Sequence, residues 1–129
     1  MAAGGMDKFF LVSIFHVIAV APFLLYVGFN RSATPDWVYN VLMGLGVLVL
    51  VYHGFKAVGR LAASSPVAWI NLIHVGIVAP LMIWIGYNGK KTGRGPYDML
   101  LLAAFAAFCF HLYKVIVMSQ TFLGGLETA

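Results

Sequence analysis

Four histidines lie inside apolar stretches of this chain, and their spacing is regular. His16 and His74 open the matching segments HVIAVAP and HVGIVAP, while His53 and His111 lie in YHGFK and FHLYK. An ionisable side chain within so apolar a stretch is costly, so it marks a functional or a structural site. Imidazole changes its charge near neutral pH, exchanges hydrogen bonds, and binds transition metals and haem iron.

This chemistry allows three interpretations of the histidines. They could form a polar clamp, in which each imidazole bonds to Ser13, Asn71, a tyrosine or a backbone carbonyl. They could line a path for protons or anions, because no carboxylate is expected at the same depth to attract metal cations. They could hold a metal or a haem iron between two helices, although no close His-x-x-x-His pair and no carboxylate behind the histidines supports this.

Other polar residues accompany the histidines at matching positions. Lys56 and Lys114 each follow a histidine by three residues, and we expect their long stems to reach headgroups or water. The candidate ligand or ion-pathway set comprises His16, His53, His74, His111, Lys56, Lys114, Asn71, Asn30 and Asn88.

Pro22 and Pro80 each follow a histidine by six residues. A proline has no backbone N–H, so the carbonyls of Ile18 and Gly76 lose their helical partners. We expect a helix kink at each proline that opens the packing on one side of the histidine. A kink that serves packing alone is the alternative interpretation.

Composition places these residues in a membrane protein. The 129-residue chain is 62% hydrophobic and only 9% charged, which lies outside the range of soluble domains. Four apolar runs, at about 9–29, 37–58, 67–87 and 97–118, are each long enough to cross about 30 Å of hydrocarbon as a helix. Because a backbone in lipid must satisfy its own hydrogen bonds, we predict an all-α protein with four transmembrane helices.

The second half of the chain repeats the first at an offset of 58 residues. Positions 9–59 align with 67–117 without a gap, and twelve of these 51 positions are identical. The identical residues include two histidine pairs, a proline, an asparagine and a lysine, which a biased composition does not explain. The sequence therefore predicts a four-helix bundle of two tandem helical hairpins, with repeat unit one at 9–59 and repeat unit two at 67–117.

Helical periodicity places the repeated residues on shared faces. Steps of three, four and seven residues align two stripes: Tyr39, Leu42, Gly46, His53 and Lys56, and Tyr97, Leu100, Ala104, His111 and Lys114. We expect both stripes to face inward and the four histidines to form one layer. Aromatic residues near the ends of the spans, Tyr39 and Tyr97 among them, suggest an interfacial belt.

The repeated motifs resemble those of a group of small viral membrane proteins. The chain carries H-V-x-x-V-A-P, an aromatic-x-G-x-N exit and an aromatic-H-x-aromatic-K ending, each of them twice. Over 9–117 it is similar to four-helix membrane proteins of unknown function encoded by large DNA viruses of algae and other protists. The resemblance implies a viral or host internal membrane, or the inner membrane of a virion, and it implies no activity.

The sequence contains no pattern typical of an enzyme. It has no nucleophile-base pair, no paired carboxylates and no CxxC motif, so we expect neither catalysis nor a resident cofactor, with haem as the alternative. Asp36 and Asp98 are expected only to stabilise helix N-termini. The one cysteine, Cys109, is expected to be a small buried residue.

We therefore expect a single membrane domain over 1–129, whose partners are the lipid bilayer and further copies of itself rather than nucleic acid. Its inward His/Asn/Lys array would line a small proton or anion path, or clamp an oligomeric assembly. The alternatives are a haem- or metal-binding membrane protein and a purely structural viral membrane component. The expected location is a viral or host internal membrane, or the plasma membrane.

Overall fold

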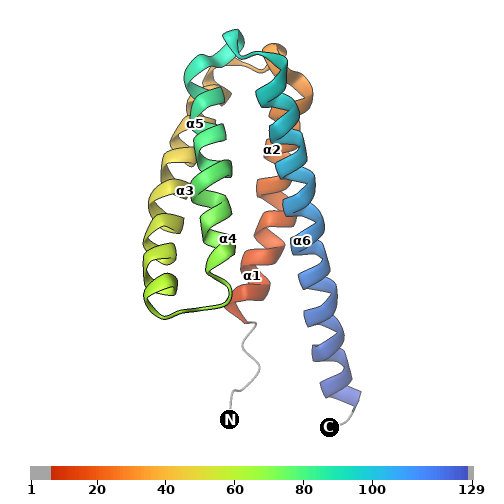
Figure 1. Cartoon of the computed structure of the whole chain (residues 1–129). Coiled ribbons are helices and arrows are strands. Elements are labelled where there is room, and N and C mark those ends of the chain that lie inside the picture. Colours follow the sequence, from red (N-terminus) through yellow and green to blue (C-terminus); the bar gives the residue numbers. More distant parts are fainter. Residues whose placement is uncertain (1–6, 128–129) are drawn as a thin grey trace. The chain divides into compact units, whose positions relative to one another are not determined.

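The computed structural model describes residues 7–127, in which all regular structure is helical and no strand occurs. Four helices in this part of the chain are long and apolar enough to cross a membrane, namely Lys8–Ala33, Asp36–Ala62, Ala68–Lys91 and Arg94–Glu127 (Figure 1). The prediction of an all-α chain with four such helices is confirmed. The predicted domain over 1–129 also includes 1–6 and 128–129, which lie outside the described residues.

The first and third of these helices are composite. In chain order the elements are α1 (Lys8–Phe15), η1 (His16–Val20), α2 (Ala21–Asn30), η2 (Arg31–Ala33), α3 (Asp36–Ala62), α4 (Ala68–Ile73), η3 (His74–Val78), α5 (Ala79–Asn88), η4 (Gly89–Lys91) and α6 (Arg94–Glu127). The segments η1 and η3 are π-helical, and η2 and η4 are short 3-10 helices. Each of these irregular segments has its counterpart 58 residues along the chain.

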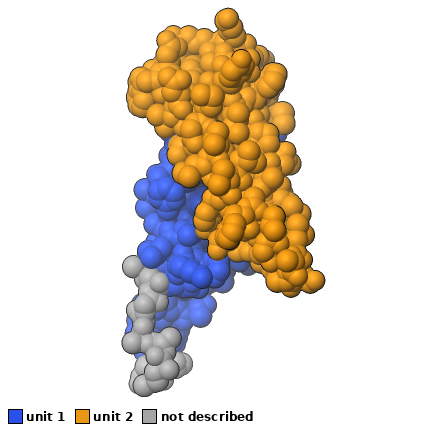
Figure 2. All heavy atoms as spheres, turned by 90° about the vertical axis from the view of Figure 1, so that its left-hand side faces the viewer, with its two compact units in different colours: residues 1–26, 102–129 blue, residues 27–101 orange. Residues whose placement is uncertain are grey.

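The helices group into two compact units (Figure 2). Unit 1 comprises residues 1–26 and 102–129, and unit 2 comprises residues 27–101. Each unit draws helical segments from both halves of the chain. The compact units therefore do not coincide with the sequence repeats at 9–59 and 67–117.

A π-helical turn precedes each Ala-Pro pair. The backbone N–H of Ala21 bonds to the carbonyl of His16, and that of Ala79 bonds to the carbonyl of His74, so both bonds span five residues instead of four. A proline ring in a regular α-helix would collide with the carbonyl four residues earlier. Widening the preceding turn relieves this collision, and the departure from regular geometry begins at the histidine.

Two residues at helix ends in unit 2 have a positive φ, which residues other than glycine rarely adopt. Gly89 has a φ of 54° directly after α5, where a residue without a Cβ is favoured. Arg31 adopts a similar φ of 50° after α2, although it carries a side chain. Pro35 then precedes α3, and Pro96 lies in the first turn of α6, where its missing N–H has no helical partner to lose.

The predicted inward stripes are buried along most of their length. Tyr39, Leu42, Tyr97, Leu100 and Ala104 are each at most 3% exposed. Gly46 is buried as well. The prediction that these residues face inward is therefore confirmed.

Two glycines bring α3 and α5 close together in unit 2. A Cβ added to Gly86 would lie 2.6 Å from the Cβ and 2.7 Å from the backbone N of Met43. A Cβ added to Gly46 would lie 3.0 Å from the backbone N of Ile83. Small residues allow helices to approach in lipid, where no hydrophobic force drives them together. The two antiparallel helices thus pack at backbone distance at these two points.

The outward faces of the helices carry many large apolar side chains. Phe55, Leu102, Ile18 and Val58 are each at least 70% exposed, and they come from three different spans. A water-soluble protein seldom exposes so many large apolar side chains to this degree. The exposed faces are compatible with an integral membrane protein whose helices contact lipid.

We predict that Gly86→Ala destabilises the protein by about 1–3 kcal/mol, because the added methyl group meets the backbone of Met43 rather than a flexible side chain. Thermal unfolding in a mild detergent would measure the effect. Gly44→Ala is the matched control on α3, since nothing lies within 4 Å of its added Cβ. It should leave the stability unchanged or raise it slightly. Equal losses in both variants would contradict the close approach.

Candidate functional site: two stacked histidine pairs

The four predicted histidines form two stacked pairs, one in each unit. In unit 2, the rings of His53 on α3 and His74 on η3 are 4.0 Å apart between centroids and inclined by only 9°. In unit 1, the rings of His16 on η1 and His111 on α6 are 4.2 Å apart and inclined by 23°. All four side chains are half-buried. The prediction of a single layer of four histidines stays a prediction.

Hydrogen bonds at Nδ1 fix the rings of the unit 2 pair. Nδ1 of His74 donates to the carbonyl of Ile70 at 2.7 Å, one turn earlier in the same helix. A carbonyl only accepts, so this nitrogen carries a proton. Nδ1 of His53 lies 3.0 Å from Oδ1 of Asn71, and this bond joins α3 to α4. The predicted contact between a histidine and Asn71 is therefore confirmed.

The unit 1 pair is held in the same way. Nδ1 of His16 donates to the carbonyl of Val12 at 2.7 Å. Nδ1 of His111 lies 3.3 Å from the hydroxyl of Ser13, which joins α6 to α1. Each of these residues lies 58 positions from its counterpart in the other pair. Ser13 takes the place that Asn71 holds in unit 2.

Stacking restricts the chemistry that each pair can perform. Two rings that lie face to face do not direct an N–H of one at a ring nitrogen of the other, so a proton has no direct hydrogen bond along which to pass. Two imidazolium cations at this separation would repel each other. The arrangement fits a pair that holds two helices together through ring contact and one bond at Nδ1.

The same geometry does not fit one haem iron shared within a pair. Axial histidines approach an iron from opposite faces with their nitrogens pointing at each other. In a stacked pair the ring nitrogens lie at the edges of two parallel planes, so they do not point toward a common iron between the rings. Among residues 7–127, no group of three or more His, Cys, Asp or Glu is placed to hold a metal ion.

Asn71 retains one unsatisfied group beside the unit 2 pair. Its side chain is only 3% exposed, and its Nδ2 has no hydrogen-bond partner within the described chain. The two ends of an amide are assigned from the bonds that they make. Whichever end faces His53, the other remains a buried polar atom, which carries a desolvation penalty.

The predicted lysines do not join the histidines in an inward array. Nζ of Lys56 lies 5.9 Å from the ring centroid of Tyr52, and Nζ of Lys114 lies 5.7 Å from that of Phe110. Both lysines are exposed, and each ammonium group lies over an aromatic ring one helical turn earlier. The prediction that these two lysines face inward is wrong, because each long side chain is exposed and turns back over a ring of its own helix.

Unlike Asn71, the predicted residues Asn30, Asn88, Pro22 and Pro80 are not among the bonding partners given above for the imidazoles. Nδ2 of Asn88 donates to the carbonyl of Trp84 at 2.8 Å, and Asn88 follows His74 by fourteen residues, or about 21 Å of helix. Asn30 is exposed at the end of α2, so it too falls outside an inward array. Pro22 and Pro80 are exposed, and they act on the histidines through the π-helical turns.

A buried tyrosine pair was not predicted as a polar site. The hydroxyls of Tyr39 and Tyr97 are 2.7 Å apart, and Tyr39 donates to the carbonyl of Arg31 at 2.6 Å. Tyr97 also reaches the carbonyl of Gly89 at 3.3 Å. Both tyrosines are at most 3% exposed, so their predicted place on the inward stripes is confirmed and their assignment to an interfacial belt is wrong. The identity of the two tyrosines across the 58-residue offset was the signal that could have indicated this pair.

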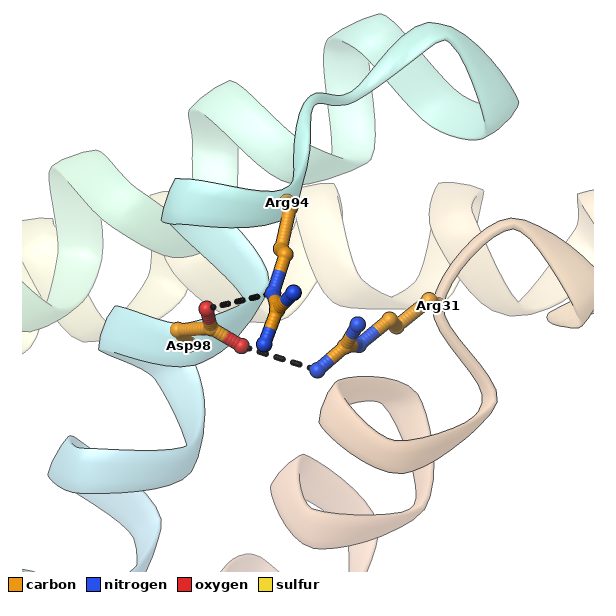
Figure 3. A network of polar contacts seen from close by, with 3 residues as sticks. All are labelled: Arg31, Arg94 and Asp98. Carbon is orange, nitrogen blue, oxygen red and sulfur yellow. Dashed lines mark hydrogen bonds and ion pairs between the residues drawn. The ribbon is translucent and has the colours of Figure 1, made fainter.

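Ion pairs connect the loops of unit 2 around these tyrosines. Asp98 accepts from Nη2 of Arg31 at 2.9 Å and from Nε of Arg94 at 3.2 Å (Figure 3). Asp36 lies 3.3 Å from Nζ of Lys90. The two aspartates therefore do more than stabilise helix N-termini. The bond to Asp98 also helps to explain how Arg31 maintains its unusual backbone conformation.

The prediction that Cys109 is a small buried residue is also wrong. Cys109 is exposed on α6, because its position on the helix falls outside the buried stripe. The thiol therefore faces away from the packed residues of unit 1.

No protein-family model, no curated protein and no solved structure matches this chain.

We predict that Tyr39→Phe destabilises the protein by about 1–2 kcal/mol and that Tyr97→Phe has a smaller effect. Each phenol has one proton, and Tyr39 both donates to Arg31 and accepts from Tyr97. Losing Tyr39 breaks both of these short bonds. Losing Tyr97 breaks the bond between the phenols and the longer 3.3 Å bond to Gly89, but it leaves the 2.6 Å bond to Arg31 intact. Thermal unfolding of the two variants side by side would measure the difference. A larger loss for Tyr97→Phe would contradict this hydrogen-bond direction.

Proposed function

We propose that this chain is a multi-pass integral membrane protein without catalytic activity, in which two histidine pairs act as polar clamps between helices. The observation that supports this most directly is that each pair combines ring stacking with an Nδ1 bond to a neighbouring helix. Interhelical hydrogen bonds in membranes contribute about 0.6 kcal/mol on average and up to about 1.7. Two such clamps would specify which helical segments pair.

We further propose that the chain is a tandem repeat of two helical hairpins. Its support comes from features that recur 58 residues apart, beginning with the π-helical turns at His16–Val20 and His74–Val78. The 3-10 helices Arg31–Ala33 and Gly89–Lys91 recur in the same way. The two histidine pairs then combine first-helix and second-helix positions from different repeats, which is what a pseudo-twofold axis would produce.

The apolar outer faces support a protein that assembles with further copies of itself in lipid. Each candidate span buries at most 33% of its most apolar window within the chain, so most of its surface remains for lipid or for other subunits. The resemblance in the histidine and proline motifs favours a viral or host internal membrane, or the inner membrane of a virion. A role as a structural component of that membrane fits the clamp.

A proton or anion path is the second candidate. The buried, unsatisfied Nδ2 of Asn71 beside His53 favours it, because a water molecule or an anion could accept that hydrogen bond. The two rings of a stacked pair do not relay a proton directly to each other.

The clamp predicts an energetic coupling between His53 and Asn71 of about 1 kcal/mol. His53→Phe keeps an aromatic ring for stacking but leaves the buried Asn71 amide without its bond, so the variant should be less stable. Adding Asn71→Leu should recover part of that loss, because the unsatisfied amide is then removed. Thermal unfolding of the two single variants and the double variant would complete the cycle. Strict additivity would contradict the clamp.

We predict that the purified protein in liposomes conducts neither protons nor anions above the level of protein-free vesicles. A pH-sensitive dye inside the vesicles, with and without an imposed potential, would measure this. If the protein does conduct, and the flux disappears in a His16→Ala plus His74→Ala variant, the pathway is supported and the clamp proposal is overturned. If the purified protein shows a visible absorption band, a haem site is supported instead.

A further inference from the structure

A shallow apolar groove lies between α3 and α5 in unit 2, where these two helices run side by side (Figure 1). It is lined by Leu50 of α3 and by Pro80, Ile83, Trp84 and Tyr87 of α5. The α5 residues follow one another at steps of three, one and three, so they form one face of that helix. Trp84 and Tyr87 remain 59% and 79% exposed beside the groove.

Two lysines follow the groove directly along the chain. Lys90 and Lys91 lie in η4, immediately after α5. Nζ of Lys90 is 3.3 Å from Asp36 at the first turn of α3, so it bridges the ends of the two helices that form the groove. Lys91 is exposed and forms no ion pair with any residue in the described range 7–127. One end of the apolar groove is therefore cationic.

We propose that this face of unit 2 binds an anionic phospholipid, with an acyl chain in the groove and the phosphate on Lys90 and Lys91. From Pro80 to Tyr87 the groove covers eight residues, or about 12 Å of helix, which fits within one leaflet of about 15 Å. The cations thus lie at headgroup level when the groove lies among the acyl chains. The proposal rests on the membrane insertion proposed above.

Two further observations favour a bound lipid at this place. The ion pair of Lys90 with Asp36 is exposed at 55% and 80%, and an exposed pair of this kind is weak, so a phosphate can share or replace the carboxylate. Trp84 and Tyr87 line the part of the groove that lies nearer to the lysines along the chain, and such side chains are enriched where a membrane meets its headgroups. The order from the apolar lining through these aromatic residues to the cations matches that of a phospholipid from tail to headgroup.

Trp84 can report on its own lipid contact. A full-length Trp37→Phe plus Trp69→Phe variant keeps Trp84 as the one tryptophan, since the chain has three. This protein is reconstituted in phosphatidylcholine vesicles that contain increasing fractions of phosphatidylglycerol, with bromine on the acyl chains of one lipid or the other. Bromine quenches tryptophan at contact distance, so the two quenching curves give the preference of the groove for the anionic lipid.

We expect Trp84 to be quenched at least about fivefold more readily by brominated phosphatidylglycerol than by brominated phosphatidylcholine at equal mole fraction. Lys90→Ala plus Lys91→Ala should reduce this ratio to near one. Asp36→Asn should raise it, because it leaves Lys90 without a competing carboxylate. Lys56→Ala removes a cation elsewhere on α3 and should leave the ratio unchanged.

A Trp69-only protein is the matched control, because Trp69 lies on α4, fifteen residues or about 22 Å before Trp84. Its quenching ratio should not respond to the two lysine substitutions. Thermal unfolding should show that each variant folds. A Trp84 ratio near one in the unsubstituted lysine background, with quenching by phosphatidylcholine intact, would overturn the lipid site alone. Absence of quenching by either lipid would overturn membrane insertion as well.

Discussion

A proline six residues after a helical histidine imposes the constraint on which each histidine pair depends. Pro22 and Pro80 supply no backbone N–H, and their rings require extra room one turn earlier. The chain meets this requirement with a π-helical turn, and in both cases the turn begins at the histidine. His16 and His74 each bond back to a carbonyl one turn earlier, and each presents a ring face to a histidine of another helix. The recurring His and Pro are therefore parts of one local structure.

Unit 2 combines this polar contact with close backbone packing. Gly46 and Gly86 allow α3 and α5 to approach, and the tyrosine pair joins the loops at the far end of the same helices from His53. The same positive φ recurs in the two loops with different residues. Gly89 adopts it without strain, whereas Arg31 adopts it at an energetic cost. The carbonyl of Arg31 accepts a hydrogen bond from Tyr39, and its side chain pairs with Asp98. Unit 2 therefore combines polar bonds near both ends of α3 with small residues between them, the two kinds of contact by which helices associate in lipid.

The helices and their buried faces could be predicted because they depend on local pattern. Spans of about 20 apolar residues and a stripe at helical spacing led to the four helices and to the burial of Leu42 and Leu100. For Tyr39 and Tyr97 these rules gave two conflicting positions, since helical spacing placed them on the buried stripes while their place near a span end suggested an interfacial belt; burial bears out the stripes. The rules misplaced Cys109, whose chemistry favours burial while its helix position does not. Lys56 and Lys114 were expected to face inward with the histidines, yet each turns back over an aromatic ring of its own helix.

The order of residues along the chain determined by itself the all-helical fold class, the number and extent of the apolar helices, and the 58-residue periodicity of the histidines, prolines and tyrosines. These properties follow from hydrophobicity and from helical geometry, which act over a few neighbouring residues. Only the tertiary structure decided that His53 meets His74, that His16 meets His111, and that the compact units cut across the two repeats. Such choices depend on which helices become neighbours, and that is set by steric contacts and hydrogen bonds between residues far apart in the chain.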